Sequence, residues 1–187
     1  MKIVKDDIWD FLNRGYCVVV TTNGYVNKTG EAVMGKGIAY QANKLFKGLA
    51  FALGKLLRDK GNHVYYFERQ KLVTFPTKNN WKDKSDIKLI EQSCRELVSL
   101  LKTFSQIKVA MPKPGCGNGK LNWEEVAPMI AHYFNSFGDR VIVVDNEQGD
   151  AGQEWRGKNK ENVKGRVDDK TVGPRIVNID GSFATGL

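Results

Sequence analysis

Cysteine, histidine and long apolar runs are all scarce in this sequence of 187 residues. The three cysteines, Cys17, Cys94 and Cys116, stand far apart, and His63 and His132 are the only histidines that can join them as metal ligands. This spacing excludes a disulfide framework and a zinc site built on paired cysteines. We therefore expect no metal, and we expect Cys17 and Cys94 to be small buried hydrophobic residues.

Apolar segments long enough to cross a membrane are also missing, since a spanning helix needs roughly 20 apolar residues. The first eleven residues, MKIVKDDIWDF, lack the apolar core of a signal peptide because Asp6, Asp7 and Asp10 interrupt them. The sequence therefore predicts a cytoplasmic protein that has no membrane partner.

The positive charge of the chain is concentrated in its first part. The formal net charge is +8, and residues 146–187 carry seven basic and seven acidic residues, so the whole excess lies in residues 1–145. A positive field of this size favours anionic partners such as nucleic acid and steers them toward the protein. The alternative interpretation is that the surplus lysines serve solubility alone.

Strand-like and helix-like patterns alternate over residues 1–145, which predicts an α/β layered domain with a mostly parallel or mixed sheet. We expect strands at 1–4, 16–22, 63–67, 72–75, 107–111 and 141–144, and helices at 6–12, 37–57, 85–103 and 122–136. Gly48 and Gly54 predict a break or bend within the second helix, and Ser85 is the expected cap of the third. Residues 146–187 form a polar C-terminal extension, in which 149–170 resembles a mobile loop and 175–179 is a candidate edge strand.

Two glycine-rich loops each follow an expected strand and precede an expected helix. The first lies within TNGYVNKTGEAVMGKGIA, residues 22–39, and the second is GCGNG, residues 115–119. In open α/β sheets ligands bind beyond the carboxyl ends of the strands, where helix starts offer unpaired N–H groups to phosphates. Either loop alone is better explained as a plain connection, but together they predict a clamp around a diphosphate. Neither loop carries a standard nucleotide-binding fingerprint.

Three sequence blocks resemble the macrodomain family, whose members bind ADP-ribose. They are AVMGKGIA at 32–39, FPTK at 75–78 followed by Trp81, and PGCGNG at 114–119 followed by Leu121 and Trp123. The FPTK block most resembles the branch of bacterial antitoxins that remove ADP-ribose from DNA. That branch is also similar to the human terminal ADP-ribose glycohydrolase and to small phosphatases acting on ADP-ribose-1″-phosphate. The likeness covers residues 1–145 and implies a three-layer α/β/α macrodomain with a mixed central sheet.

The resemblance also implies roles for individual residues. Asp7 with Ile8 matches the acidic residue that binds the adenine amino group, Asn23 matches an asparagine near the distal ribose, and Lys78 matches a catalytic lysine. The residues matching the two phosphate loops are Met34, Gly35, Lys36, Gly37 and Ile38 in the first, and Gly115, Cys116, Gly117, Asn118 and Gly119 in the second. Gly119 stands where the human relative has an aspartate that works with its lysine, and the antitoxin branch has glycine there as well.

The residues themselves leave several interpretations open. A lysine at a strand end near apolar walls can lose its proton and act as a nucleophile or base, or stay charged and stabilise negative charge. Lys78 can equally be an ordinary surface lysine, Asp7 a helix cap, and Asn23 a turn former. Cys116 lies at a helix start, where a thiol pKa falls, although no histidine is near it in sequence. Trp81 and Trp123 are expected to be packing residues rather than base stackers.

The sequence and the resemblance together predict an ADP-ribosyl hydrolase that removes ADP-ribose from modified nucleic acid or protein. Lys78 would attack or polarise C1″ of the distal ribose, and Asn23 would orient that sugar. Water is the only co-substrate required, and no cofactor is implied. Two alternatives share the same site: an ADP-ribose-1″-phosphate phosphatase, and a module that binds ADP-ribose without turnover.

Overall fold

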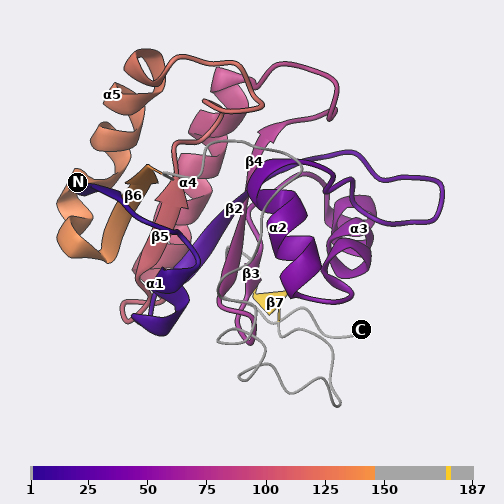
Figure 1. The fold of residues 1–187 in the computed structure, drawn as a ribbon, viewed down its shortest axis with the longest axis horizontal. Coiled ribbons are helices and arrows are strands. Elements are labelled where there is room, and N and C mark those ends of the chain that lie inside the picture. The colour runs from indigo at the N-terminus through magenta and orange to yellow at the C-terminus, as the bar shows by residue number, and fades with distance from the viewer. Residues whose placement is uncertain (1, 146–175, 178–187) are drawn as a thin grey trace.

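The computed structural model describes residues 2–145 and 176–177. Within these residues the chain forms one seven-stranded sheet in the order β1-β6-β5-β2-β4-β3-β7 (Figure 1). The strands are β1 Lys2–Lys5, β2 Cys17–Asn23, β3 Tyr66–Phe67, β4 Leu72–Lys78, β5 Val109–Pro112, β6 Val141–Asp145 and β7 Ile176–Val177. The mobile loop expected at 149–170 lies outside the described residues.

The sheet is mixed, as expected from the sequence. The first five strands of the order, from β1 to β4, pair in parallel. The last two strands are antiparallel to their neighbours, β3 to β4 and β7 to β3. Because β7 lies within the segment 175–179, the prediction of an edge strand there is confirmed at its two described residues.

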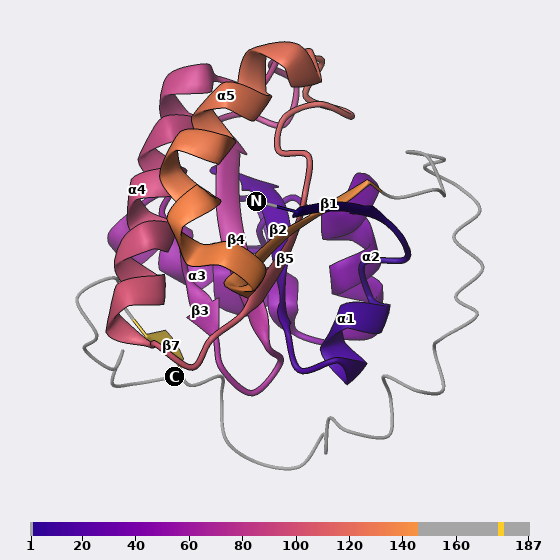
Figure 2. The same ribbon diagram turned by 90° about the vertical axis from the view of Figure 1, so that its left-hand side faces the viewer.

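Helices cover both faces of the sheet. They are α1 Asp10–Asn13, α2 Gly37–Leu45, α3 Leu49–Lys60, α4 Ile87–Thr103 and α5 Trp123–Phe134, followed by the 3₁₀ helix η1 Asn135–Arg140. Helices α4 and α5 lie on one side, and α1 and α2 lie on the other (Figure 2). No helix within 2–145 is long and apolar enough to cross a membrane.

Alternating side chains of the central strand β2 enter the two cores. Val18 and Val20 pack with the core residues of α1, α2 and α3, whereas Cys17 and Val19 pack with those of α4 and α5. This alternation is the period-2 pattern of a strand buried on both faces. It confirms the expected three-layer α/β/α architecture and the burial of Cys17, and Cys94 of α4 is buried as well.

The start of α4 differs from the prediction. Asp86, not Ser85, is the N-cap, and its carboxylate accepts the Lys88 N–H at 2.9 Å. Ser85 is buried, and its backbone N–H donates to the carbonyl of Gly119 at 2.9 Å. The helix therefore begins after Asp86 because the second glycine-rich loop already holds the backbone of Ser85.

The long helix expected at 37–57 is two helices, separated by a turn at Gly48. Gly48 has a φ of +80°, a left-handed conformation that favours glycine, so the predicted break is confirmed there. Gly54, in contrast, neither breaks nor bends the chain. A Cβ on Gly54 would collide with the Gly30 carbonyl oxygen and would lie 2.8 Å from the Ala32 nitrogen. Glycine at this position lets α3 lie directly against the backbone of the first loop.

Two strand boundaries also differ from the expected ones. The strand expected at 63–67 is only Tyr66–Phe67, and the strand expected at 72–75 extends to Lys78. The extension follows from parallel pairing with β2, which continues beyond Thr74 to the end of both strands. As a consequence Lys78 is the last residue of a central strand rather than part of a loop.

Replacing Gly54 by alanine tests the contact between α3 and the first loop. Alanine normally stabilises a helix by about 0.5–1 kcal/mol relative to glycine. Here we expect the opposite sign, a loss of roughly 1–3 kcal/mol in the free energy of unfolding, because the added methyl overpacks the interface. Urea unfolding of the Gly54→Ala variant measures the change. Unchanged or increased stability would show that the loop does not rest on α3.

Candidate active site

The five parallel strands all end at the same edge of the sheet, and the predicted site residues gather there. Asp7 and Ile8 follow β1, Asn23 ends β2, and Lys78 ends β4. The second glycine-rich loop follows β5, and the first follows β2. Four strand spacings separate β1 from β4, which at about 4.8 Å each gives a span of about 19 Å. The edge is therefore wide enough for an extended ligand with several chemical groups.

Asn23 and Lys78, the two predicted catalytic residues, are neighbours across the β2–β4 pair. Their Cα atoms are partners in the register, after a shift between Thr22 and Asn23. The Gly24 N–H donates to the carbonyls of both Lys78 and Asn79, each at 3.1 Å, which ties the two strand ends together. The fold thus brings residues 55 positions apart in sequence to one place, as the prediction required.

The Lys78 ammonium connects the turn after β4 with the second loop. Its Nζ donates to the carbonyl of Asp83 at 2.7 Å and to that of Asn118 at 3.3 Å. Partial burial lowers the pKa of Lys78, the Asp83 carboxylate opposes this shift, and the positive charges of Lys120 and Lys36 add to it. The Lys78 amine therefore loses its proton more readily than the amine of an ordinary lysine. Its two hydrogen bonds hold it in place at this edge of the sheet.

The Asn23 side chain shapes the start of the first loop. Its Nδ2 donates to the Val33 carbonyl at 2.8 Å, and its Oδ1 accepts the Tyr25 N–H at 3.0 Å. These contacts are those of a turn former, one of the two interpretations left open by the sequence. A primary amide has two N–H donors, so a contact with a ribose remains a prediction alongside this structural role.

The first loop is held in place by several anchors despite its polar, glycine-rich sequence. Val26 and Ala32 form an antiparallel bridge, and the Ala32 N–H donates to the Ala50 carbonyl of α3 at 2.8 Å. The Arg58 guanidinium donates to the Gly30 carbonyl at 2.5 Å. A loop that is ordered before a ligand binds loses less conformational entropy on binding.

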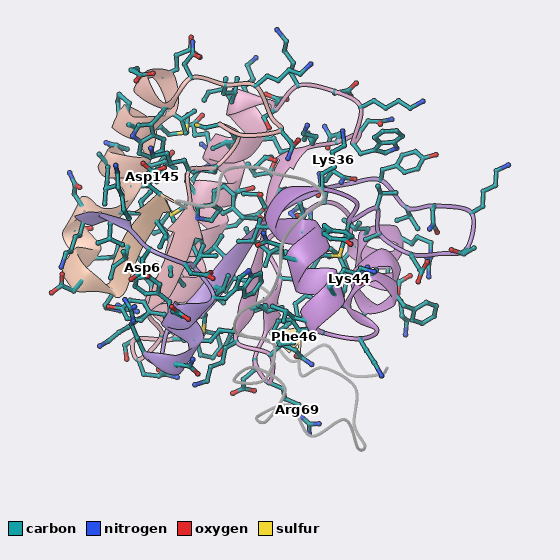
Figure 3. The ribbon with its side chains drawn as sticks, in the orientation of Figure 1. Asp6, Lys36, Lys44, Phe46, Arg69 and Asp145 are labelled. Carbon is teal, nitrogen blue, oxygen red and sulfur yellow. The ribbon has the colours of Figure 1, made fainter. Side chains whose placement is uncertain are left out.

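The end of the first loop exposes main-chain donors at the start of α2. Lys36 is the N-cap, and within 2–145 no side chain caps this helix. The first N–H groups of a helix have no partner within it, and they carry a partial positive charge. A Cβ on Gly35 would meet no atom within 4 Å, and Lys36 lies beside this helix start (Figure 3). These features suit an anion, and anion binding by Gly35, Lys36 and Gly37 stays a prediction.

Three predicted ligand-binding residues have buried side chains. Ile8 is fully buried in the core, and Met34 and Ile38 are 6% and 9% exposed. The side chains of Ile8, Met34 and Ile38 therefore position the backbone at the edge. Any contact of these residues with a ligand would come from their main-chain groups.

The glycines of the second loop divide into two kinds. Gly115, at φ +78°, and Gly119 both face tightly packed atoms. A Cβ added to Gly115 would lie 2.8 Å from Ile90 Cδ1, and a Cβ added to Gly119 would collide with Ser85 Oγ. Packing against α4 and the residues before it is sufficient to require glycine at both positions. Gly117 and Asn118 are exposed, so the loop backbone is accessible at these two residues, and its contact with a ligand stays a prediction.

Cys116 has the properties of a structural thiol. Its Sγ–H donates to the Pro114 carbonyl at 3.5 Å, and burial raises the pKa of the thiol to about 11, with Lys113 opposing and Glu124 and Glu125 adding to the increase. A thiol with this pKa stays protonated at neutral pH, and the next helix, α5, begins only at Trp123, so Cys116 is not at a helix start as expected. This protonation disfavours the open alternative of a cysteine nucleophile.

Asp7 begins the turn that leads into α1. Its Oδ1 accepts the Trp9 N–H at 2.9 Å within this turn, but the N-cap of α1 is Trp9, so Asp7 is not the expected helix cap. Asp6 forms an ion pair with Arg14 at 2.8 Å. Burial raises the pKa of Asp7, the hydrogen bond from Trp9 opposes the shift, and the carboxylates of Asp10 and Asp6 add to it. The proposed contact of Asp7 with an adenine stays a prediction.

Sequence reasoning missed three features of this edge. Trp81 was expected to pack, but it is 45% exposed, whereas Trp123 packs against the core of α4 and α5 as expected. Tyr25, two residues after Asn23, is 43% exposed, which no sequence pattern indicated. The Asp83 carbonyl holds Lys78, which the sequence could not indicate because the contact depends on the turn.

Among the described residues, no group of three or more histidine, cysteine or acidic side chains is placed to hold a metal.

Part of this chain is similar in sequence to known proteins. No profile of a known protein family matches it. The DNA ADP-ribosyl transferase–DNA ADP-ribosyl glycohydrolase fusion protein of Thermosipho africanus is 34% identical over 107 residues, which are 57% of this chain and 26% of that protein. The ADP-ribose glycohydrolase OARD1 of Homo sapiens is 27% identical over 119 residues, which are 59% of this chain and 72% of that protein. The chain spans only about a quarter to a third of the curated DNA ADP-ribosyl glycohydrolases that it matches.

Solved structures extend the similarity to the fold. Thermosipho africanus DarTG in complex with ADP-ribose superposes with a TM-score of 0.65 at 26% identity, over 76% of this chain and 40% of that one. The macrodomain of Mycobacterium tuberculosis DarG gives a TM-score of 0.64 at 25% identity, over 76% of this chain and 95% of that one. The second match covers nearly the whole of a single domain.

Alkylation of cysteine tests the protonation state assigned to Cys116. Because its pKa is raised to about 11, we expect iodoacetamide to modify Cys116 more slowly at pH 8 than it modifies free cysteine, and faster as the pH rises toward 11. Cys17 and Cys94 are buried and should stay unmodified in the folded protein. Peptide mass spectrometry after timed labelling measures each site. Rapid labelling of Cys116 at pH 7 would instead indicate an activated thiolate.

Proposed function

We propose that the chain is a macrodomain of the branch that includes the DNA ADP-ribosyl glycohydrolases, and that it binds ADP-ribose and hydrolyses its bond to a modified macromolecule. One observation carries this proposal: Asn23, Lys78 and both glycine-rich loops meet at a single edge of the sheet. The names of the relatives support the activity, and the geometry supports the assignment of individual residues.

The order of the strands matches the order of groups in ADP-ribose. Along the edge, Asp7 after β1 comes first, then the second loop after β5, then the first loop after β2, and finally Lys78 at the end of β4. ADP-ribose has adenosine at one end, a diphosphate in the middle and the distal ribose at the other end. In this proposal Asp7 binds the adenine, and the N–H groups around Gly37 and Gly117 hold the diphosphate. The distal ribose then lies beside Lys78.

Lys78 provides the chemistry at C1″ of the distal ribose. As a neutral amine it would attack C1″, the bond from C1″ to the substrate would break with proton transfer to the leaving group, and water would later release ADP-ribose from the lysine. As an ammonium it would instead stabilise the leaving group while water attacks C1″ directly. The lowered pKa of Lys78 supports the first route, and its position as a hydrogen-bond donor supports the second.

Nucleic acid is the substrate that charge and similarity favour. The whole net charge of +8 belongs to residues 1–145, and phosphate contacts supply much of nucleic-acid binding. Several of the relatives are named as glycohydrolases of ADP-ribosylated DNA. We therefore assign modified DNA as the preferred substrate over modified protein.

Replacement of Lys78 tests the catalytic assignment. We expect Lys78→Ala to slow the release of ADP-ribose from an ADP-ribosylated oligonucleotide by roughly 10²–10⁴-fold, because the catalytic group is lost. Lys78→Arg keeps a positive donor but removes the nucleophile, so a nearly active arginine variant indicates the electrostatic route. The matched control is Lys102→Ala, an exposed lysine in the last turn of α4, which ends at the opposite edge of the sheet. Full activity in Lys78→Ala would exclude the assignment.

Replacement of Gly35 tests the diphosphate site without disturbing the fold. A side chain at Gly35 meets open space, and its φ lies outside the left-handed region, so the Gly35→Glu variant should fold normally. We expect its carboxylate to repel the diphosphate and weaken ADP-ribose binding about tenfold or more, as measured by calorimetry. The Gly35→Gln variant has the same size without the charge and should bind more tightly than Gly35→Glu. Equal affinity of Gly35→Glu and the unmodified protein would place the diphosphate elsewhere.

A further inference from the structure

The edge that holds Lys78 also carries two exposed aromatic rings, which we call the aromatic platform: Tyr25 and Trp81. We propose that the platform and the lysines around it bind single-stranded nucleic acid by stacking on the bases next to the modified nucleotide. The proposal deepens the proposed function, since it rests on a nucleic-acid substrate and names the surface that holds it.

Both residues of the platform follow the Asn23–Lys78 pair closely along the chain. Tyr25 is two residues after Asn23, and Trp81 is three residues after Lys78. The two chain segments are joined by the hydrogen bonds from the Gly24 N–H to the carbonyls of Lys78 and Asn79. A polymer that contacts either ring is therefore next to the residue proposed to cleave the bond to ADP-ribose.

Trp81 is held outward by an ordered turn. The Asn80 side-chain oxygen accepts the Lys82 N–H at 3.1 Å, and the Asn80 carbonyl accepts the Asp83 N–H, also at 3.1 Å. Lys78 closes the same turn through its bond to the Asp83 carbonyl. The turn thus keeps a large apolar ring 45% exposed, with the Lys82 ammonium 5.3 Å from the ring centroid. An exposed ring beside a cation is suited to a base and its adjoining phosphate.

The charged side chains of the segments around the platform are complementary to a phosphate chain. The segments 24–37, 78–85 and 113–121 contain seven lysines but only two acidic residues, Glu31 and Asp83. Among these lysines, Lys28, Lys36, Lys82, Lys84 and Lys120 are exposed. Such a patch attracts nucleic acid in a salt-dependent way. An apolar partner protein would explain the rings but not the lysines.

A single strand fits the platform better than a duplex does. In a duplex the bases stack on one another and are paired, so their faces are unavailable to protein rings. In a single strand each base offers a free face, and aromatic side chains bind such faces with little sequence preference. Each ring lies within three residues of the proposed catalytic pair, so the bases next to the modified nucleotide are the ones that would stack.

Binding of an unmodified oligonucleotide tests the platform separately from catalysis. The probe is a fluorescein-labelled, unstructured pyrimidine DNA strand of about 12 nucleotides, a length within the usual range of such sites. Fluorescence anisotropy at low salt should show Trp81→Ala and Tyr25→Ala each binding about 5- to 100-fold more weakly than the unmodified protein. Trp81→Phe keeps an aromatic face and should retain most of the affinity.

Two matched controls lie outside the platform. Phe51→Ala removes another exposed aromatic ring, in the first turn of α3. Lys102→Ala removes an exposed lysine at the opposite edge of the sheet. Both variants should bind the strand as the unmodified protein does, and the duplex of the same sequence should bind at least about tenfold more weakly than the single strand.

Three results would overturn the platform. They are equal affinities of Trp81→Ala and Phe51→Ala, equal affinities for duplex and single strand, and absence of oligonucleotide binding by the unmodified protein. The last result, together with release of ADP-ribose from modified protein, would assign the edge to a protein substrate. Because the probe carries no ADP-ribose, failure of the platform appears in this assay, whereas failure of the proposed hydrolase appears in the Lys78→Ala assay.

Discussion

Parallel pairing of five strands is the constraint on which the candidate site depends. Parallel neighbours need long crossover connections, so each strand ends at the same edge and its loop leaves from there. Residues from Asp7 to Gly119 therefore meet without any local signal in sequence that they are close. The register of β2 with β4 then sets the decisive detail, because it places the last residues of the two strands, Asn23 and Lys78, beside each other.

Lys78 joins three parts of this edge electrostatically. Its ammonium bonds to the turn after β4 and to the second loop, and the charges of Lys36 and Lys120 act on it from both glycine-rich loops. A bound diphosphate would neutralise those neighbouring charges, so ligand binding and the protonation of Lys78 are physically linked. The anchors of the first loop on α3 and of the second loop on Ser85 hold this arrangement before any ligand arrives.

Sequence patterns predicted the layers, the mixed sheet and the edge strand, because burial of strands and helices follows local periodicity. They missed what depends on contacts between distant segments. The extension of β4 to Lys78 comes from its pairing with β2, and the requirement for glycine at Gly54 and Gly119 comes from backbone that packs against them. The exposure of Trp81 was missed for the same reason, since composition alone does not show on which side of a turn a ring lies.

A crystal structure with ADP-ribose bound tests the proposed site most directly. We expect the adenine beside Asp7, the diphosphate between the backbones of Gly35 and Gly117, and Lys78 Nζ within about 3.5 Å of C1″, the distance at which attack can occur. A ligand bound in the reverse direction, with its adenine beside Lys78, would contradict the assignment of every subsite. A ligand bound away from the carboxyl ends of β2 and β4 would contradict the proposed function itself.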